Sequence, residues 1–153
     1  MEPITFTPGT LVVLVGPSAS GKSTFARQYP ATWSLCLDVL RGQIADDEAD
    51  QSATFTALRI QHALLEARLA RGLTTLIADT NLAPHVRGAL LGAARFWGRP
   101  AHAVLFGLPL AECERRNASR DRTVPVEILR EQYARKPTAA ELAAEGFDHV
   151  HHV

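Results

Sequence analysis

An octet near the start of the chain constrains its fold more than any other feature. It reads Gly-Pro-Ser-Ala-Ser-Gly-Lys-Ser over residues 16–23 and matches the pattern GxxxxGK[ST]. The run before it, Thr10–Val15, has the apolar and β-branched composition of a strand buried on both faces, and the amphipathic segment after it stops at Pro30. A buried strand, a glycine loop and a helix in this order predict a phosphate-binding loop.

The chemistry of this loop predicts a nucleotide as its ligand. Gly16 and Gly21 permit backbone angles that a Cβ would hinder, so that successive N–H groups can face one anion. The Lys22 side chain is expected to bridge the β- and γ-phosphates of ATP, and the Ser23 hydroxyl to coordinate Mg²⁺. The residues expected to hold the nucleotide from this segment are Gly16, Ser18, Ala19, Ser20, Gly21, Lys22, Ser23 and Thr24.

Strand and helix patterns alternate along the rest of the chain, which favours a parallel sheet with helices on both faces. We predict one α/β domain over residues 1–153, a three-layer P-loop NTPase sandwich with a mainly parallel sheet of about five strands and an arginine-bearing lid. The apolar residues of the segment 55–71 recur at helical spacing, at Phe55, Leu58, Leu65 and Leu69. Further strands are expected at Trp33–Leu37, Thr74–Ala78, Ala101–Leu108 and Asp148–His152, and helices at Phe55–Arg71, Pro84–Trp97, Leu110 to about Asn117 and Pro125–Tyr133.

Composition limits the classes of partner. The chain has 16 basic residues (Lys and Arg) and 16 acidic residues (Asp and Glu). This balance weighs against extended electrostatic binding to a duplex, but not against binding of one strand end by a few arginines. Cys36 and Cys113 form no paired motif, so a reducing cytoplasm is expected. No apolar run approaches the roughly 20 residues that span a bilayer, and residues 1–8 lack a secretion signal. No membrane partner is expected.

The remaining motifs narrow the class of nucleotide-dependent protein. The NKxD and DxxG segments of a GTPase are absent from the sequence, and a motor or AAA-type ATPase needs a longer chain. Positive charge gathers late in the chain, where Arg115, Arg116, Arg120 and Arg122 fall within eight residues. In small kinases such arginines close over the transferring phosphoryl group and neutralise its oxygens.

Several segments together resemble the 5′-OH polynucleotide kinases, both the kinase module of bacterial end-healing enzymes and the phage enzyme. The resemblance runs over nearly the whole chain, and the D-x-x-R pair followed by an acidic stretch is more particular to this family than the glycine loop. The segments that carry it are Leu11–Phe25, Leu37–Gly42, Asp46–Gln51, Asp79–Asn81, Arg116–Arg122 and Gly146–Phe147.

The resemblance implies roles for residues on the acceptor side. Asp38 would be the general base that takes the proton from the attacking 5′-hydroxyl, and Arg41 would read the phosphate next to the acceptor end. Asn81 would also contact the acceptor. From its position alone, without the resemblance, Asp38 is better explained as the N-cap of a helix. The acidic residues 46–50 would form a fixed loop beside the acceptor that holds Arg41 or a neighbour, without a catalytic role.

On the donor side, the resemblance makes Arg116 the best match for the essential arginine that contacts the ATP phosphates. Arg120 comes next and Arg122 after it, because the chain is one residue shorter than the bacterial module at this point. Asp79 would hold a magnesium-bound water, as would Asp38, although the bacterial modules place this acid one residue earlier. A strand-end turn explains Asp79 as well.

These features lead to one expected function and two alternatives. The expected function is transfer of the γ-phosphate of ATP, with Mg²⁺, to the 5′-OH end of DNA or RNA. The chain would either stand alone, be an excerpt of a longer protein, or act with separate phosphatase or ligase partners. A kinase of a nucleoside, sugar or antibiotic, or a nucleotide-binding switch without acceptor chemistry, would carry the same loop. The sequence leaves open the strand type, the donor base and the oligomeric state.

Overall fold

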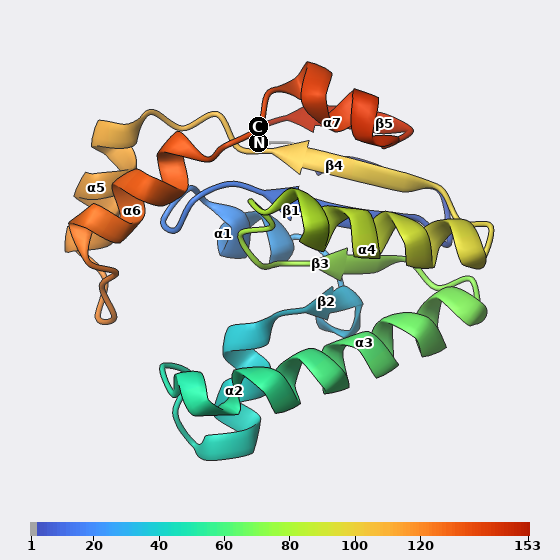
Figure 1. Ribbon diagram of the computed structural model, residues 1–153, viewed down its shortest axis with the longest axis horizontal. Coiled ribbons are helices and arrows are strands. Elements are labelled where there is room, and N and C mark those ends of the chain that lie inside the picture. The colour runs from blue at the N-terminus through green and yellow to red at the C-terminus, as the bar shows by residue number, and fades with distance from the viewer. Residues whose placement is uncertain (1–2) are drawn as a thin grey trace.

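The computed structural model describes residues 3–153, so Met1 and Glu2 of the opening segment lie outside the described residues. Its strands form one sheet in the order β2-β3-β1-β4-β5, and every neighbouring pair is parallel (Figure 1). The expected α/β class, the parallel sheet and its five strands are confirmed. The strands are β1 Leu11–Val15, β2 Ser34–Leu35, β3 Thr75–Ile77, β4 Ala101–Leu105 and β5 His149–His152.

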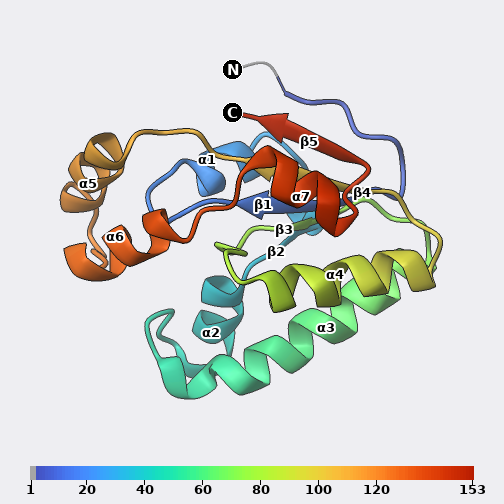
Figure 2. The same cartoon turned by 45° about the horizontal axis from the view of Figure 1, so that its top comes forward.

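Seven α-helices connect the strands within residues 3–153. In Figure 2, α3 and α4 run side by side below the sheet, and in both Figures 1 and 2 α5 and α6 lie beyond its carboxyl end. None of these helices is both long and apolar enough to cross a bilayer. The helices are α1 Lys22–Ala26, α2 Leu37–Ala45, α3 Thr54–Ala70, α4 Pro84–Phe96, α5 Leu110–Ala118, α6 Val126–Ala134 and α7 Ala139–Glu145.

The central strand β1 supplies both halves of the core. All five of its residues are buried, and because side chains alternate between the faces of a strand, they divide between two apolar clusters. Val12 and Leu14 pack with Phe25 of α1 on one face. Leu11, Val13 and Val15 join residues of α3, α4 and α7 on the other face. The loop after β1 therefore starts from the most firmly held element of the sheet.

Several sequence predictions need correction. The second strand stops at Leu35, and Asp38 lies in the first turn of α2, whose N-cap is Cys36, so the N-cap interpretation of Asp38 is wrong. The fourth strand ends at Leu105 rather than at residue 108. Helix α7 forms in a segment without apolar periodicity, because Thr138 and Glu141 make a capping box at its start.

The helical spacing that predicted α3 also assigned the wrong residues to the core. Leu65 and Leu69 are buried as expected, but Phe55 is 72% exposed and Leu58 47% exposed. Both lie in the part of α3 that extends past the carboxyl end of the sheet, where no strand covers the helix (Figure 1). Apolar residues that recur every 3.6 positions show which side chains share a helix face, but they do not show how far along that face the core continues.

A buried ion pair joins the last helix to the loop that follows β3. The Arg87 side chain on α4 is 2% exposed and donates two hydrogen bonds to Glu145 of α7, at 2.6 and 2.7 Å. Its remaining nitrogen donates to the carbonyls of Asn81 and Leu82. Because all three nitrogens of this guanidinium have partners, the pair fixes the loop at residues 79–82 against both helices.

Glu145→Ala tests this pair. The variant leaves the Arg87 charge buried without its counter-ion, so we expect the free energy of unfolding to fall by about 3 kcal/mol, measured by urea denaturation. Glu114→Ala is the matched control, because it removes an exposed pair with Arg130 and should cost only a small fraction of that loss. Equal losses in the two variants would contradict the assigned role.

Candidate functional site

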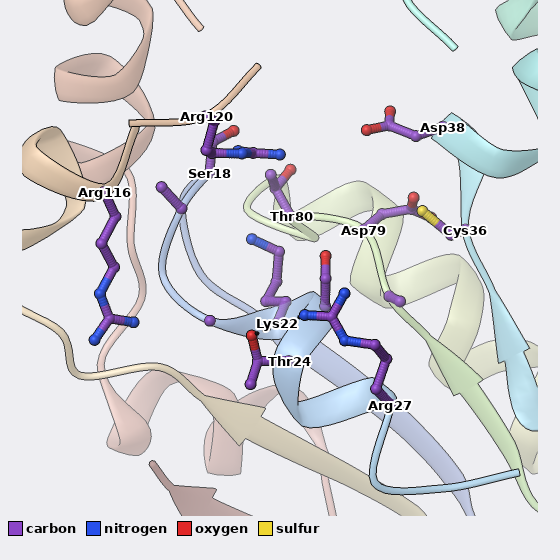
Figure 3. A pocket seen from close by; sticks show the side chains of 14 residues that line it. Ser18, Lys22, Thr24, Arg27, Cys36, Asp38, Asp79, Thr80, Arg116 and Arg120 are labelled. Carbon is purple, nitrogen blue, oxygen red and sulfur yellow. Dashed lines mark hydrogen bonds between the residues drawn. The ribbon is translucent and has the colours of Figure 1, made fainter. Parts of the chain in front are cut away.

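A pocket of about 460 Å³ opens at the carboxyl ends of β1 and β3, next to α1, α2 and α5 (Figure 3). Open parallel sheets bind their ligands at this edge. The structure brings most of the predicted site residues together in this pocket. It is lined by Ser18, Ala19, Gly21, Lys22, Ser23, Thr24, Arg27, Cys36, Asp38, Ala78, Asp79, Thr80, Arg116 and Arg120.

The glycine loop has the backbone geometry of an anion nest. Ala19 and Gly21 have positive φ angles of 59° and 107°, and Gly21 is the N-cap of α1. Gly16 is required for a different reason from the one expected. Its φ is not positive, but a Cβ there would lie 2.8 Å from the Ser20 Oγ and 2.9 Å from the Phe106 Cβ. Space rather than backbone angle demands glycine at position 16.

The Lys22 side chain lies inside this loop. Its Nζ donates to the carbonyls of Gly16 at 2.9 Å and Pro17 at 2.5 Å. Burial lowers the pKa of Lys22 to about 8, against a smaller opposing effect of the Asp79 carboxylate. A buried ammonium that two carbonyls orient can meet an anion at low reorganisation cost.

Asp79 lies two residues after the end of β3 and faces the pocket. Its Oδ1 accepts a hydrogen bond from the Leu37 N–H at 2.8 Å, and its Oδ2 accepts one from the Gln61 side-chain amide at 2.6 Å. Burial raises the pKa of Asp79, and these two hydrogen bonds oppose that rise. One carboxylate thereby joins β3 to the first residue of α2 and to the middle of α3.

Asp38 faces the pocket from the first turn of α2, on the opposite side from Arg116 (Figure 3). Its carboxylate pairs with Arg41 one helical turn later. Arg41 is buried, and its Nε donates to the Glu48 carbonyl at 2.9 Å. The acidic loop after α2 thus holds Arg41, and Arg41 in turn holds Asp38.

The three arginines expected to cover the nucleotide differ in position. Arg116 and Arg120 line the pocket, and Glu112 accepts a hydrogen bond from Arg116 at 2.9 Å. Arg122 is not part of the lining and instead lies 3.5 Å from an oxygen of Asp38. Arg122 therefore contacts Asp38 in this structure, and its predicted contact with the nucleotide phosphates stays a prediction.

Asn81 is buried, and its side-chain nitrogen donates to the carbonyls of Leu14, Ile77 and Asp79. With a positive φ of 49°, it shapes the turn after β3. An acceptor contact by Asn81 stays a prediction, and its observed bonds tie the end of β3 to β1.

Sequence reasoning missed four groups around the site. Arg27, Cys36 and Thr80 line the pocket, and Gln132 on α6 accepts a hydrogen bond from the Ser18 N–H at 2.9 Å. Arg27 is one α-helical turn after Ser23, a spacing that could have placed it on the pocket side of α1. The other three depend on chain crossings that no local pattern encodes.

A second cavity of about 540 Å³ adjoins the first and shares Gly21, Thr24 and Arg116 with it. Its remaining walls are mainly apolar and include Phe25 and Phe106. The buried Ser20 Oγ at its edge has no hydrogen-bond partner within the described part of the chain. This cavity has the position and polarity that a nucleoside attached to phosphates in the first pocket would need.

The oxygen groups of the pocket fit a magnesium ion, which favours oxygen ligands and keeps several waters. The Ser23 hydroxyl and the carboxylates of Asp38 and Asp79 all line it. Both Asp79 oxygens already accept hydrogen bonds, so that residue suits a water-mediated contact better than a direct one. The predicted magnesium roles of these three residues stay predictions.

The buried lysine leads to a test by pH. The folded pKa of Lys22 is about 8, below the ordinary 10.5, so its charged form opposes folding below pH 8 and this cost disappears as pH rises toward 10.5. Between pH 8 and pH 10.5 the free energy of unfolding of wild type should therefore rise by up to about 3 kcal/mol relative to that of Lys22→Met. Urea unfolding at several pH values measures it, and a pH-independent difference would contradict the burial of a charged lysine.

Comparison with solved structures shows the fold. One chain of "the Pnkp1/Rnl/Hen1 RNA repair complex" aligns with a TM-score of 0.72 at 22% identity, over 94% of this chain and 48% of that one. Chaetomium thermophilum Kti12 in complex with ADP-AlF3 has a TM-score of 0.66 at 18% identity, over 94% and 88% of the two chains. A gluconokinase from Sinorhizobium meliloti 1021 has a TM-score of 0.56 at 21% identity, over 95% and 82%.

The chain thus spans less than half the length of the Pnkp1-complex chain that it resembles. No curated protein matches it in sequence. A family model described as an AAA domain, AAA_33, matches residues 11–138, so chain length alone does not separate this protein from AAA domains. Because that match covers most of the sequence, the chain belongs to the AAA_33 family and has the fold of the P-loop kinases.

Proposed function

We propose that this protein transfers the γ-phosphoryl group of ATP to the 5′-hydroxyl end of a DNA or RNA strand. The observation that carries the proposal is the position of the Asp38 carboxylate, which faces the Lys22 loop across the pocket and is held there by Arg41 (Figure 3). A carboxylate so placed can orient a hydroxyl for in-line attack on a phosphate held by the loop.

The reaction assigns one task to each group. The 5′-oxygen forms a bond to the γ-phosphorus, the bond from that phosphorus to the bridging oxygen breaks, and ADP leaves. Asp38 takes the proton of the hydroxyl. Lys22, Arg116 and Arg120 hold the phosphoryl oxygens and stabilise the charge of the transition state. Mg²⁺, held through Ser23 and by water to Asp38 and Asp79, would supply further neutralisation of the phosphates.

Arg41 supports the base in this proposal. Its guanidinium is buried between Asp38 and the Glu48 carbonyl, so we infer that it positions Asp38, while the contact with an acceptor phosphate that the resemblance implies stays a prediction. Arg41→Ala should therefore slow transfer to any acceptor, so it does not separate a polynucleotide from a small molecule. Comparing a large acceptor with small ones separates these two classes of kinase better than this variant does.

The similar structures support a kinase but differ in what their titles name. One belongs to an RNA repair complex and another is a gluconokinase. We propose the nucleic-acid acceptor because the Asp38–Arg41 pair and the acidic loop that follows match the 5′-OH polynucleotide kinases. We also propose that residues 1–153 work as one kinase domain and that a phosphatase or a ligase acts with it.

Asp38→Asn tests the base. The amide keeps the shape of the carboxylate but accepts no proton, so we expect kcat on a 5′-OH oligonucleotide to fall at least about 100-fold while ATP affinity changes little. Asp46→Asn is the matched control, an exposed acid at a left-handed position that Asn tolerates. Similar kcat values for the two variants would contradict the assignment.

The acceptor class is tested with labelled ATP and Mg²⁺ on 5′-OH oligonucleotides, adenosine and gluconate. The proposal predicts transfer to the oligonucleotide at the highest kcat/KM. Faster transfer to adenosine or gluconate would establish a small-molecule kinase instead. ATP binding without transfer to any acceptor, and without an effect of Asp38→Asn, would indicate a nucleotide-dependent switch.

A further inference from the structure

A third cavity, of about 280 Å³, adjoins the phosphate pocket beside Leu37 at the start of α2. The two share Asp79 and Thr80 as their common boundary. Side chains of α3, α4 and α6 enclose this cavity, which we call the side cavity. A ligand group in the side cavity could therefore extend a hydroxyl past Thr80 toward a phosphate held by the Lys22 loop.

The free surface of the side cavity is mainly apolar. Leu58 of α3, Val86 of α4 and Leu37 at the start of α2 contribute to its walls. Several of its polar groups already have partners, because Gln61 donates to Asp79, Asp79 also accepts from the Leu37 N–H, and the Asn81 amide donates to the Leu14 carbonyl. A polyhydroxylated acceptor would leave its hydroxyl groups unpaired here, which costs binding energy, whereas a flat apolar ring would not.

The rim of the side cavity continues onto an exposed aromatic ring. Leu58 is 47% and Val86 37% exposed, and Phe55, three residues before Leu58 on the same face of α3, is 72% exposed. An exposed aromatic side chain next to an apolar cavity suits bases that stack in succession. The exposed Arg135, at the end of α6, also lines the cavity and can supply a positive charge for a strand phosphate.

Helix α6 also connects the two halves of the site. Gln132 lines the side cavity, and its Oε1 accepts the hydrogen bond of the Ser18 N–H in the phosphate loop. Movement of α6 would thus alter both cavities together. The contact places the side cavity beside the proposed transfer site and not on a separate surface.

From these contacts we infer that the side cavity binds the base of the terminal 5′-OH nucleotide, with the next base of the strand stacked on Phe55. The inference rests on the proposed function and deepens it, because it makes a nucleic-acid strand with an intact terminal base the preferred acceptor. It assigns Leu58 and Val86 to the first base, and Phe55 to the second.

The test compares two short 5′-OH oligonucleotides, one intact and one whose terminal nucleotide lacks its base. Wild type should transfer phosphate to the intact strand with a kcat/KM about tenfold higher or more. Leu58→Ser should remove most of that preference. Phe55→Ala should raise KM for the oligonucleotide about tenfold, with little change in kcat or in KM for ATP.

Phe96→Ala is the matched control, since Phe96 is 76% exposed at the far end of α4 and should leave every parameter unchanged. Transfer by wild type without any preference for the intact strand, or equal KM values for Phe55→Ala and Phe96→Ala, would overturn the base pocket alone. Absence of transfer to every 5′-OH oligonucleotide would overturn the proposed function itself.

Discussion

The position of the proposed catalytic base depends on one buried carboxylate. Asp79 accepts hydrogen bonds from the Leu37 N–H and from Gln61, and these bonds fix the start of α2 relative to β3. Because β3 is paired with β1, the start of α2 is also fixed relative to the loop that carries Lys22. The strand that leads into this helix, β2, has only two residues, so the Asp79 bond adds a second direct connection between the start of α2 and the sheet. The hydrogen bonds also offset part of the cost of burying the Asp79 charge.

The charges around the pocket explain why an anionic ligand and an acidic base can share it. Lys22, Arg27, Arg116 and Arg120 line the side where phosphates are proposed to lie. Asp38 faces them, and its own partners Arg41 and Arg122 come from outside the lining. The base is thus stabilised by cations that do not compete for the phosphate. Although the chain has no net charge, its positive and negative side chains lie on different sides of the pocket. Such a local arrangement suits binding of one strand end better than binding of a long duplex.

Much of this arrangement was predictable from the sequence. The loop at residues 16–23, the alternation of strands and helices, and the closeness of Asp38, Asp79 and Arg116 to that loop follow from motif, periodicity and resemblance. The rest depends on contacts between distant segments. Nothing local indicates that Gln132 reaches the Ser18 N–H or that Arg122 turns toward Asp38. Apolar periodicity also could not show that α3 continues past the sheet and leaves Phe55 exposed, since core coverage depends on strand length.

The central claim is that the Asp38 carboxylate meets a chain-end hydroxyl in front of the γ-phosphate of ATP. A crystal structure with Mg²⁺, a non-hydrolysable ATP analogue and a 5′-OH oligonucleotide measures this directly. The account predicts that the 5′-oxygen lies about 3 Å from an Asp38 oxygen, in line with the bond between the γ-phosphorus and its bridging atom. A terminal hydroxyl that lies elsewhere, with Asp38 out of hydrogen-bond reach, would contradict it.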